Sequence, residues 1–175
     1  MIIDNMQIIT ILLNILNNAF IVLFIFNLLK VNHLNPIVLP LVRFYKFTFG
    51  RIYLIPNQLL NIFLLAVLSK LISIGLIFSD QYDLTVLFMV SIIQTLMTSL
   101  RLIFFAVIGG VILSWVSQNN SNPGLQLIEE VSHKIQSPIR RYIPSAGGLD
   151  FSPIFVIIFI NLAQNLLTDI LRSIV

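Results

Sequence analysis

The residues of this sequence that could perform chemistry are few, and their spacing matches no catalytic or metal site. The two histidines, His33 and His133, have no metal-ligating residue at the short spacing of zinc sites. Cysteine is absent, which excludes disulfides, thiolate ligands and thiol nucleophiles. No Ser–His–acid arrangement can be built without assuming that distant segments meet. We therefore predict no enzyme activity, no catalytic residue, no metal site and no cofactor.

The composition is that of a membrane protein. Hydrophobic residues make up 58% of the chain and charged residues 10%, and the mean hydropathy is +1.00. Soluble domains carry about 25% charged residues. The net charge of +3 would suggest nucleic acid in a soluble protein. Here the basic residues lie between hydrophobic runs, which fits membrane orientation better, so we predict no nucleic-acid partner.

Four segments are apolar enough to span a bilayer, which takes about 20 residues. We predict an all-α membrane protein with spans at about 8–29, 59–78, 95–116 and 151–172. The third lies in a longer hydrophobic run, 84–116, which must either tilt strongly or project its first turns. Residues 1–7 lack the basic residues of a cleavable signal peptide, so we expect the first span to remain.

The basic residues predict how the chain is oriented. The short connection 79–83 contains Asp80 and Asp83 and no basic residue, whereas both long loops are basic. The basic residues of these loops are Lys30, Arg43, Lys46, Arg51, Lys134, Arg140 and Arg141. Because cytoplasmic loops are enriched in Lys and Arg, we expect both long loops in the cytoplasm and both termini on the opposite side.

Each long loop contains a short helical pattern. In the second loop, Asn122 and Pro123 form a helix start, and Pro138 is expected to end the helix. In the first loop, Pro40 is expected to start a helix and Gly50 to end it. Its expected apolar face is Leu41, Phe44, Phe47 and Thr48. We predict that both are amphipathic helices lying at the membrane interface.

The two loops resemble each other. Asn35-Pro36 corresponds to Asn122-Pro123, and Ile55-Pro56 corresponds to Ile143-Pro144. Lys46 and Lys134 fall at matching places between these pairs. The order predicts two tandem repeats, 1–83 and 84–175. They would be parallel, because a unit of two spans returns to its starting side.

Polar residues recur at helical spacing within the predicted spans. Gln94, Thr98 and Arg101 do so on the third, and Asn161, Asn165 and Asp169 on the fourth. Such groups normally face the bundle interior or water and pair with one another. Counting the helical rise from the cytoplasmic ends predicts an Arg101–Asp169 contact, with Lys70 close enough to join it. We interpret these residues as glue between helices, with a permeation path as the alternative.

The segment around the last predicted span carries residues with clear physical roles. Asp150 and Ser152 before Pro153 form a helix N-cap, and Gly147 and Gly148 permit a tight turn into it. Trp115 falls where an interfacial ring is expected. Gly109 and Gly110 should permit close helix approach. Pro138 and Pro144 bracket the surface arginines Arg140 and Arg141, and would stiffen their presentation.

Two stretches resemble the signature of the YggT family: Ser114-Trp115-Val116-Ser117, and Ser137 to Pro144 continued by Gly147 to Pro153. In the first half, Gly50-Arg51-Ile52-Tyr53 replaces the proline and paired arginines. The resemblance implies a small bacterial inner-membrane protein, with YlmG and plastid relatives, built as two repeats. The family is associated with osmotic tolerance, cell division and the organisation of photosynthetic complexes or nucleoids, and none of these is a defined molecular activity.

We therefore expect an organising, assembly or envelope-stress (osmotic) protein of the inner membrane with periplasmic termini. Its docking surface would be basic: Arg140, Arg141, Lys134, Arg43, Lys46 and Arg51. The expected partners are anionic lipid headgroups, which attract each basic residue by about 1 kcal/mol, or a membrane complex. For Arg140 and Arg141, the simpler interpretation is an orientation anchor. The alternative function is a small ion transporter or channel component, and a homo-oligomer is compatible with both.

Overall fold

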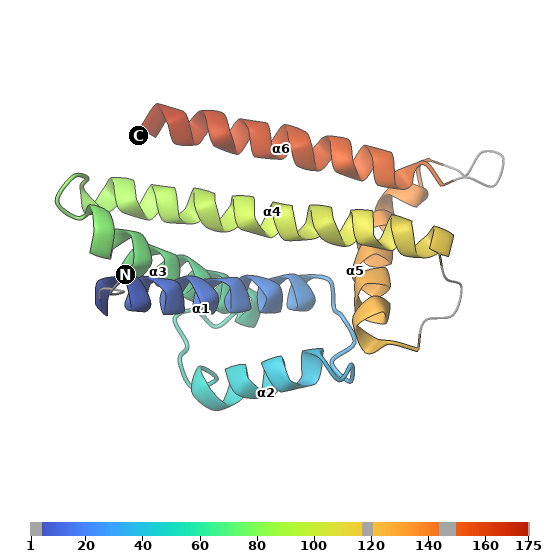
Figure 1. Ribbon diagram of the computed structural model, residues 1–175, viewed down its shortest axis with the longest axis horizontal. Helices are drawn as coiled ribbons and strands as arrows, with labels where there is room; N and C mark the ends of the chain where they lie inside the picture. Colours follow the sequence, from blue (N-terminus) through green and yellow to red (C-terminus); the bar gives the residue numbers. More distant parts are fainter. Residues whose placement is uncertain (1–4, 117–120, 144–149, 175) are drawn as a thin grey trace.

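The fold of the computed structural model is entirely helical over the residues that it describes, 5–116, 121–143 and 150–174. Six helices follow one another with no strand in these ranges (Figure 1). They are α1 (Asn5–Leu28), α2 (Val38–Thr48), α3 (Gln58–Phe78), α4 (Leu84–Val116), α5 (Pro123–Arg140) and α6 (Ser152–Ile174). The predicted all-α fold class is confirmed.

Four of these helices, α1, α3, α4 and α6, are long and apolar enough to cross a membrane. Each contains nearly all of the corresponding predicted span, and the chain is compatible with a multi-pass membrane protein. The predicted third span belongs to a single unbroken helix of 33 residues. At a rise of 1.5 Å per residue, α4 is about 50 Å long, well beyond the roughly 30 Å of a hydrocarbon core.

The four long helices run side by side along the long axis and alternate in direction (Figure 1). The start of α1, the end of α6 and the α3–α4 turn lie at one end, and α5 lies at the other. Both ends of the described chain are therefore on the same side of the bundle. This is the arrangement that an even number of crossings requires.

The largest core cluster joins α1, α2, α3 and α5 around apolar residues such as Phe20 and Ile62. A polar contact lies beside it: Asn17 is buried, and its Nδ2 donates a hydrogen bond to the Ala66 carbonyl oxygen at 2.8 Å. The two helices are thereby fixed in register. Because an unsatisfied amide is costly in an apolar interior, this asparagine stabilises one specific pairing of α1 with α3.

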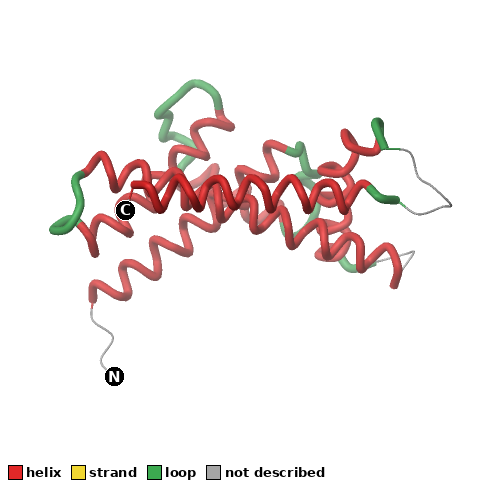
Figure 2. The backbone as a smooth tube through the Cα atoms, turned by 90° about the horizontal axis from the view of Figure 1, so that it is seen from above, coloured by secondary structure: helices red, strands yellow, loops and turns green. Residues whose placement is uncertain are grey.

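Helix α2 lies alongside α1. The Phe20 ring, well before the end of α1, is 6.4 Å from Tyr45 and 4.9 Å from Phe49 between ring centroids. The chain therefore turns back after α1, and Figure 1 shows α2 running along the bundle axis, whereas α5 crosses it. Seen from above, the long helices overlap at the middle of the bundle and spread apart toward its ends (Figure 2).

One prediction about α2 is wrong. The helix begins at Val38, before Pro40, which lies inside its first turn, where the missing N–H of proline costs nothing. The buried residues of the helix are Val38, Val42 and Tyr45. The predicted apolar face is a different one, and at Phe47, which is 90% exposed, the bundle does not cover it.

Helix α5 crosses the end of α4, and it continues through Pro138 to Arg140. The prediction that Pro138 ends the helix is therefore wrong. Proline removes only one backbone hydrogen bond here and keeps a helical φ. The predicted start is confirmed, because the Asn122 side chain accepts a hydrogen bond from the Gly124 N–H at 2.8 Å. The extra turn carries Arg140 to the start of α6.

Candidate functional site

A pocket of about 520 Å³ lies where α5 crosses between the end of α4 and the start of α6. Most of its polar lining comes from α5 and from the segment before α6. The lining residues are Gly110, Val111, Ser114, Trp115, Glu129, Ser132, His133, Gln136, Arg140, Asp150 and Pro153. The predicted motif residues Trp115, Arg140, Asp150 and Pro153 are thus brought together in one place.

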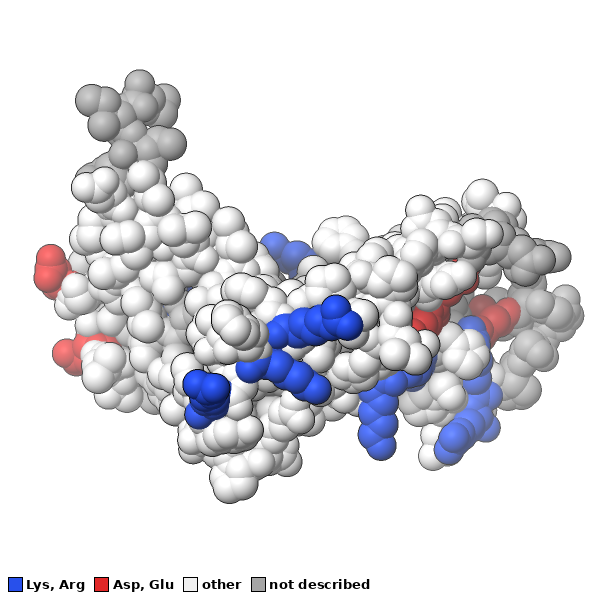
Figure 3. Space-filling view, turned by 90° about the horizontal axis from the view of Figure 1, so that it is seen from below, with Lys and Arg blue, Asp and Glu red and all other residues white. Residues whose placement is uncertain are grey.

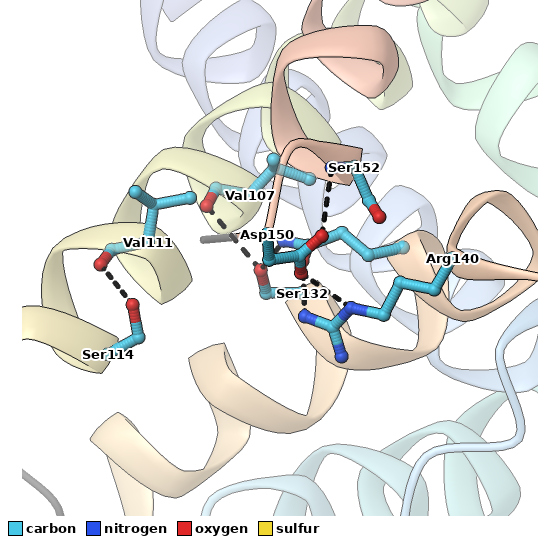
Figure 4. Close-up of polar contacts among 8 residues, drawn as sticks. Val107, Val111, Ser114, Ser132, Arg140, Asp150 and Ser152 are labelled. Atoms are coloured by element: carbon cyan, nitrogen blue, oxygen red, sulfur yellow. Dashed lines mark hydrogen bonds and ion pairs between the residues drawn. The ribbon is translucent and has the colours of Figure 1, made fainter. Parts of the chain in front are cut away.

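A chain of hydrogen bonds crosses this junction (Figure 4). Ser132 Oγ, on α5, donates to the Val107 carbonyl oxygen of α4 at 3.4 Å, and Gln136 Nε2 donates to Ser132 Oγ at 2.7 Å. The Gln136 side-chain oxygen accepts from Arg140 Nη2 at 2.7 Å. Arg140 Nε then meets Asp150 Oδ2 at 2.6 Å. The arginine is therefore held in one orientation from both sides.

The sequence alone did not single out Ser132 or Gln136. Both are buried, at 3% exposure each, and neither belongs to the family-like motif. The signal was present, because Ser132, Gln136 and Arg140 are spaced i, i+4 and i+8 and so share one face of α5. This polar row lay beside the apolar stripe that defined the helix and did not stand out from it.

Close approach of α5 to α4 depends on two glycines. A Cβ atom at Gly110 would lie 2.2 Å from Ser132 Oγ, and one at Gly109 would lie 2.9 Å from Ile128 Cγ2. The predicted role of both glycines in close helix approach is confirmed. The helix that approaches is α5, from the loop that follows α4, and the Val107 carbonyl oxygen of α4 thereby comes within reach of Ser132 Oγ.

Asp150 has the predicted capping role and a second one. Its Oδ1 accepts a hydrogen bond from the Ser152 N–H at 2.9 Å, while its Oδ2 pairs with Arg140. Partial burial opposes ionisation. The hydrogen bond from the Ser152 N–H and the Arg140 guanidinium outweigh it and hold the pKa of Asp150 below its usual value. The buried Ser152 Oγ itself has no hydrogen-bond partner within the described ranges.

The lowered pKa of Asp150 predicts an acid-sensitive junction. A carboxyl whose folded pKa is depressed contributes stability above its unfolded pKa and loses it as the pH falls through the folded pKa. We expect wild type to unfold at higher temperature than Asp150→Asn at pH 7, and the gap to close below about pH 4. Because the pair is about one-third exposed, its contribution is at most about 1 kcal/mol. A gap that stayed constant from pH 7 to pH 3 would contradict this.

An apolar groove of about 430 Å³ continues from the polar pocket between α4 and α6. The two cavities share Val111, Trp115, Asp150 and Pro153. The remaining groove residues are Ile108, Ile112, Phe151, Ile154 and Ile157. The polar pocket therefore opens onto an apolar groove that runs along the side of α4 and α6. Trp115, 78% exposed, stands at the boundary between them.

The other predicted basic residues are dispersed. Lys134 Nζ lies 2.8 Å from Glu130 Oε1 and also donates to the Lys30 carbonyl oxygen, so it holds α5 against the α1–α2 connection. Arg141 is exposed beside the junction. Arg43, Lys46 and Arg51, also exposed, lie on or just after α2. Figure 3 shows Lys and Arg side chains along one flank, and acidic side chains both at the end that holds the α3–α4 turn and among the basic side chains toward the other end.

The predicted contact between Arg101 and Asp169 is wrong. Asp169 Oδ1 lies 3.7 Å from Arg172 Nη1, and no ion pair of Arg101 occurs in the described ranges. Lys70 joins neither, because its Nζ donates to Asn14 Oδ1 at 3.1 Å. Asn161 and Asn165 are exposed on α6.

Some predicted site residues cannot be placed, and one kind of site is not found. Pro144, Gly147 and Gly148 lie outside the described residues. Within the described part of the chain, no group of three or more His, Asp or Glu residues is arranged to hold a metal ion. His133 lines the pocket, whereas His33 lies exposed in the α1–α2 connection.

Comparison with known proteins identifies the segment that builds this junction. The family model described as CCB3/YggT matches residues 89–171, from α4 through α5 into α6. Residues 89–171 of the chain belong to the YggT family. The match covers the motif, the junction pocket and the groove, and it leaves out α1, α2 and α3. The predicted family is confirmed.

Individual relatives of the YggT family are uncharacterized. One from Pseudomonas aeruginosa is 40% identical over 47% of this chain and 42% of its own length. One from Haemophilus influenzae is 29% identical over 66% and 60%. YggT of Escherichia coli K12 is 27% identical over 63% and 58%. The chain thus spans about half the length of the curated relatives that it matches. No solved structure matches it.

Proposed function

We propose that this chain is a non-enzymatic protein of the bacterial inner membrane that organises membrane components from its cytoplasmic face. In this orientation α5, the junction pocket and the α1–α2 connection lie at the cytoplasmic surface, and both termini are periplasmic. The acidic α3–α4 turn at the opposite end supports this choice, because Lys and Arg favour the cytoplasmic side. The predicted assembly and osmotic roles belong to this proposal.

The two halves would be tandem repeats of long helix, short helix and long helix. The element order supports this, and the two matching Asn-Pro segments touch each other: Asn35 Nδ2 donates to the Pro123 carbonyl oxygen at 2.9 Å. We propose that α5 is an amphipathic helix lying flat at the interface, since it crosses the long helices. Helix α2, which runs along α1, would instead cover the flank of the bundle.

The observation that carries the proposal is the polar pocket that opens onto an apolar groove. A membrane phospholipid has this shape and polarity, with a charged headgroup joined to an acyl chain. The bonds to Asp150 and Gln136 occupy part of the Arg140 fork, and the guanidinium has further N–H donors for a phosphate. Arg141 adds a second positive charge at the surface, and Trp115 would sit between headgroup and chain.

Thermal unfolding in detergent tests this site with added phosphatidylglycerol. Wild type should gain several degrees, and Trp115→Ala and Arg141→Ala should lose most of that gain. Neither side chain takes part in the junction hydrogen bonds. Arg43→Ala is the matched control, because it removes the same charge from α2 and should keep the gain. Equal gains in all four proteins would indicate general charge attraction and would overturn the site.

A second candidate function, an ion transporter or channel component, is favoured by one observation. Polar side chains at membrane depth, including Arg101 and Asp169, are exposed on the outside of the long helices. A pore would therefore have to form between chains. Reconstitution into liposomes separates the candidates, because selective ion flux supports the second and its absence, with lipid binding at the junction, supports the first.

A further inference from the structure

Helix α6 carries a polar row on a face that its own chain leaves uncovered. Asn161, Asn165 and Asp169 follow at i, i+4 and i+8, so they share one face, and all three are exposed. The Asp169 side chain is 74% exposed. Helix α6 packs against the rest of the chain through other residues, among them the buried Val156 and Ile160.

Arg101 on α4 faces the same side. Leu100 and Phe104 pack against the cluster of Val107, Val156 and Ile160, so this part of α4 is level with the middle of α6. The two helices are antiparallel (Figure 1). In an antiparallel pair, the residues that directly follow the contact positions project to the same side. Arg101 after Leu100 and Asn161 after Ile160 are therefore neighbours on one outer face.

Asp169 lies farther along this face, which explains why Arg101 does not reach it. Leu171 packs with Leu87 and Val90 in a separate cluster at the end that holds the α3–α4 turn. Asp169 is therefore level with the first half of α4, about two helical turns from Arg101. The outer face thus presents a cation beside two amides, with the acid set apart from them.

Such a face cannot be left against lipid without a large cost. Ionisable and amide groups within membrane-spanning helices almost always face a protein interior or a water-filled cavity. The Arg101 guanidinium carries five N–H donors and no acceptor, and it makes no ion pair in the described part of its own chain. The asparagine amides each need both a donor and an acceptor. A covering partner has to supply both kinds of group at this depth.

We propose that the part of this face formed by Arg101, Asn161 and Asn165 binds the same face of a second copy of this chain. A two-fold axis along the membrane normal keeps equal residues at equal depth. An amide is complementary to itself, because it both donates and accepts, so each asparagine can pair with its equivalent. Arg101 is level with Asn161 and can donate to its side-chain oxygen in the second copy. The inference is independent of the proposed lipid site, which lies at the other end of α6.

Cysteine cross-linking tests the pairing directly, because the chain has no cysteine of its own. Ile158 shares the polar face by helical spacing, whereas the adjacent Phe159 points away from it, and both are exposed apolar residues. In oxidised membranes, Ile158→Cys should form a disulfide-linked dimer at least ten times more than Phe159→Cys. Adding Asn161→Leu and Asn165→Leu to Ile158→Cys should reduce the amount of cross-linked dimer several-fold. The unfolding temperature of the monomer should not change.

Three outcomes would overturn the proposal. They are equal cross-linking at Ile158→Cys and Phe159→Cys, a cross-linked product whose mass is not twice that of the chain, and a wild-type protein that is monomeric by mass in lipid nanodiscs. The second would show that a different membrane protein covers the face. None of these outcomes affects the lipid test at the junction, since the variants leave Trp115 and Arg141 unchanged.

Discussion

Replacing Gly110 with leucine is expected to detach α5 from α4 and to cost about 3 kcal/mol or more of unfolding free energy. Even a single Cβ atom there would lie 2.2 Å from Ser132 Oγ and 2.3 Å from Ser132 Cβ. Rotation of the Ser132 side chain can move Oγ but not Cβ, which the backbone fixes, so rotation alone cannot clear the space. The Ser132–Val107 hydrogen bond would be lost as well, and with it the support of Gln136 and Arg140.

Gly75→Leu provides the matched control. Gly75 is also inside a long apolar helix, α3, but a Cβ atom there would meet nothing within 4 Å. We expect this variant to be at least as stable as wild type, because glycine in a helix interior costs about 1 kcal/mol. Thermal unfolding in detergent and limited proteolysis of the α5 segment measure both effects. Similar behaviour of the two variants would refute the close-packing account.

The second large effect is expected at Asn61. Its side chain, 2% exposed, accepts a hydrogen bond from the Leu54 N–H and donates one to the Ile52 carbonyl oxygen, both at 2.8 Å. These bonds fix the connection before α3 against the helix. Asn61→Leu keeps nearly the same volume but leaves two backbone groups without a partner. Since such groups cost about 1–3 kcal/mol each, we expect a loss of about 2–3 kcal/mol.

Asn57→Ala is the comparison for this prediction. Asn57 caps the same helix, accepting from the Leu59 N–H at 2.9 Å, and removing a cap costs about 1 kcal/mol. The free energy of unfolding should therefore fall clearly further for Asn61→Leu than for Asn57→Ala. Hydrogen exchange of the Leu54 amide gives an independent measure, and it should accelerate strongly in Asn61→Leu. If the order of the two variants were reversed, Asn61 would not be the residue that holds this connection.

The junction has a consequence for how the halves of the chain meet. Glu130 on α5 accepts a hydrogen bond from the Asn32 N–H at 2.9 Å, and Lys134 donates to the Lys30 carbonyl oxygen. Lys30 adopts a left-handed conformation, with φ of 51°, at the end of α1, which turns the chain toward α5. Helix α5 therefore joins the α1–α2 connection to α4 and α6. A displacement of α5 at the pocket would also displace the α1–α2 connection in the first half of the chain.

The features that the sequence predicted correctly depend on neighbouring residues. Four candidate spans could be recognised because the bilayer sets a minimum length of apolar helix. The length and the hydropathy of a segment can be read from that segment alone. The caps at Asn122 and Asp150 were predictable for the same reason, since a cap acts on the next few backbone amides. The motif from Trp115 to Pro153 also identified the family. In the fold, its residues Arg140 and Asp150 form part of the hydrogen-bond network at the junction of α4, α5 and α6.

The features that only the tertiary structure decided are the partners of side chains from distant segments. Arg101 and Asp169 were matched in depth from the sequence, but the packing of Leu100 and Phe104 on α6 sets a register that separates them. The hydrogen bond of Lys134 to the Lys30 carbonyl oxygen joins segments about one hundred residues apart and could not be predicted from the sequence. The register and the crossing of two helices depend on which side chains interlock where they meet. At Gly110, the absence of a Cβ atom is what allows α5 to pack closely on α4.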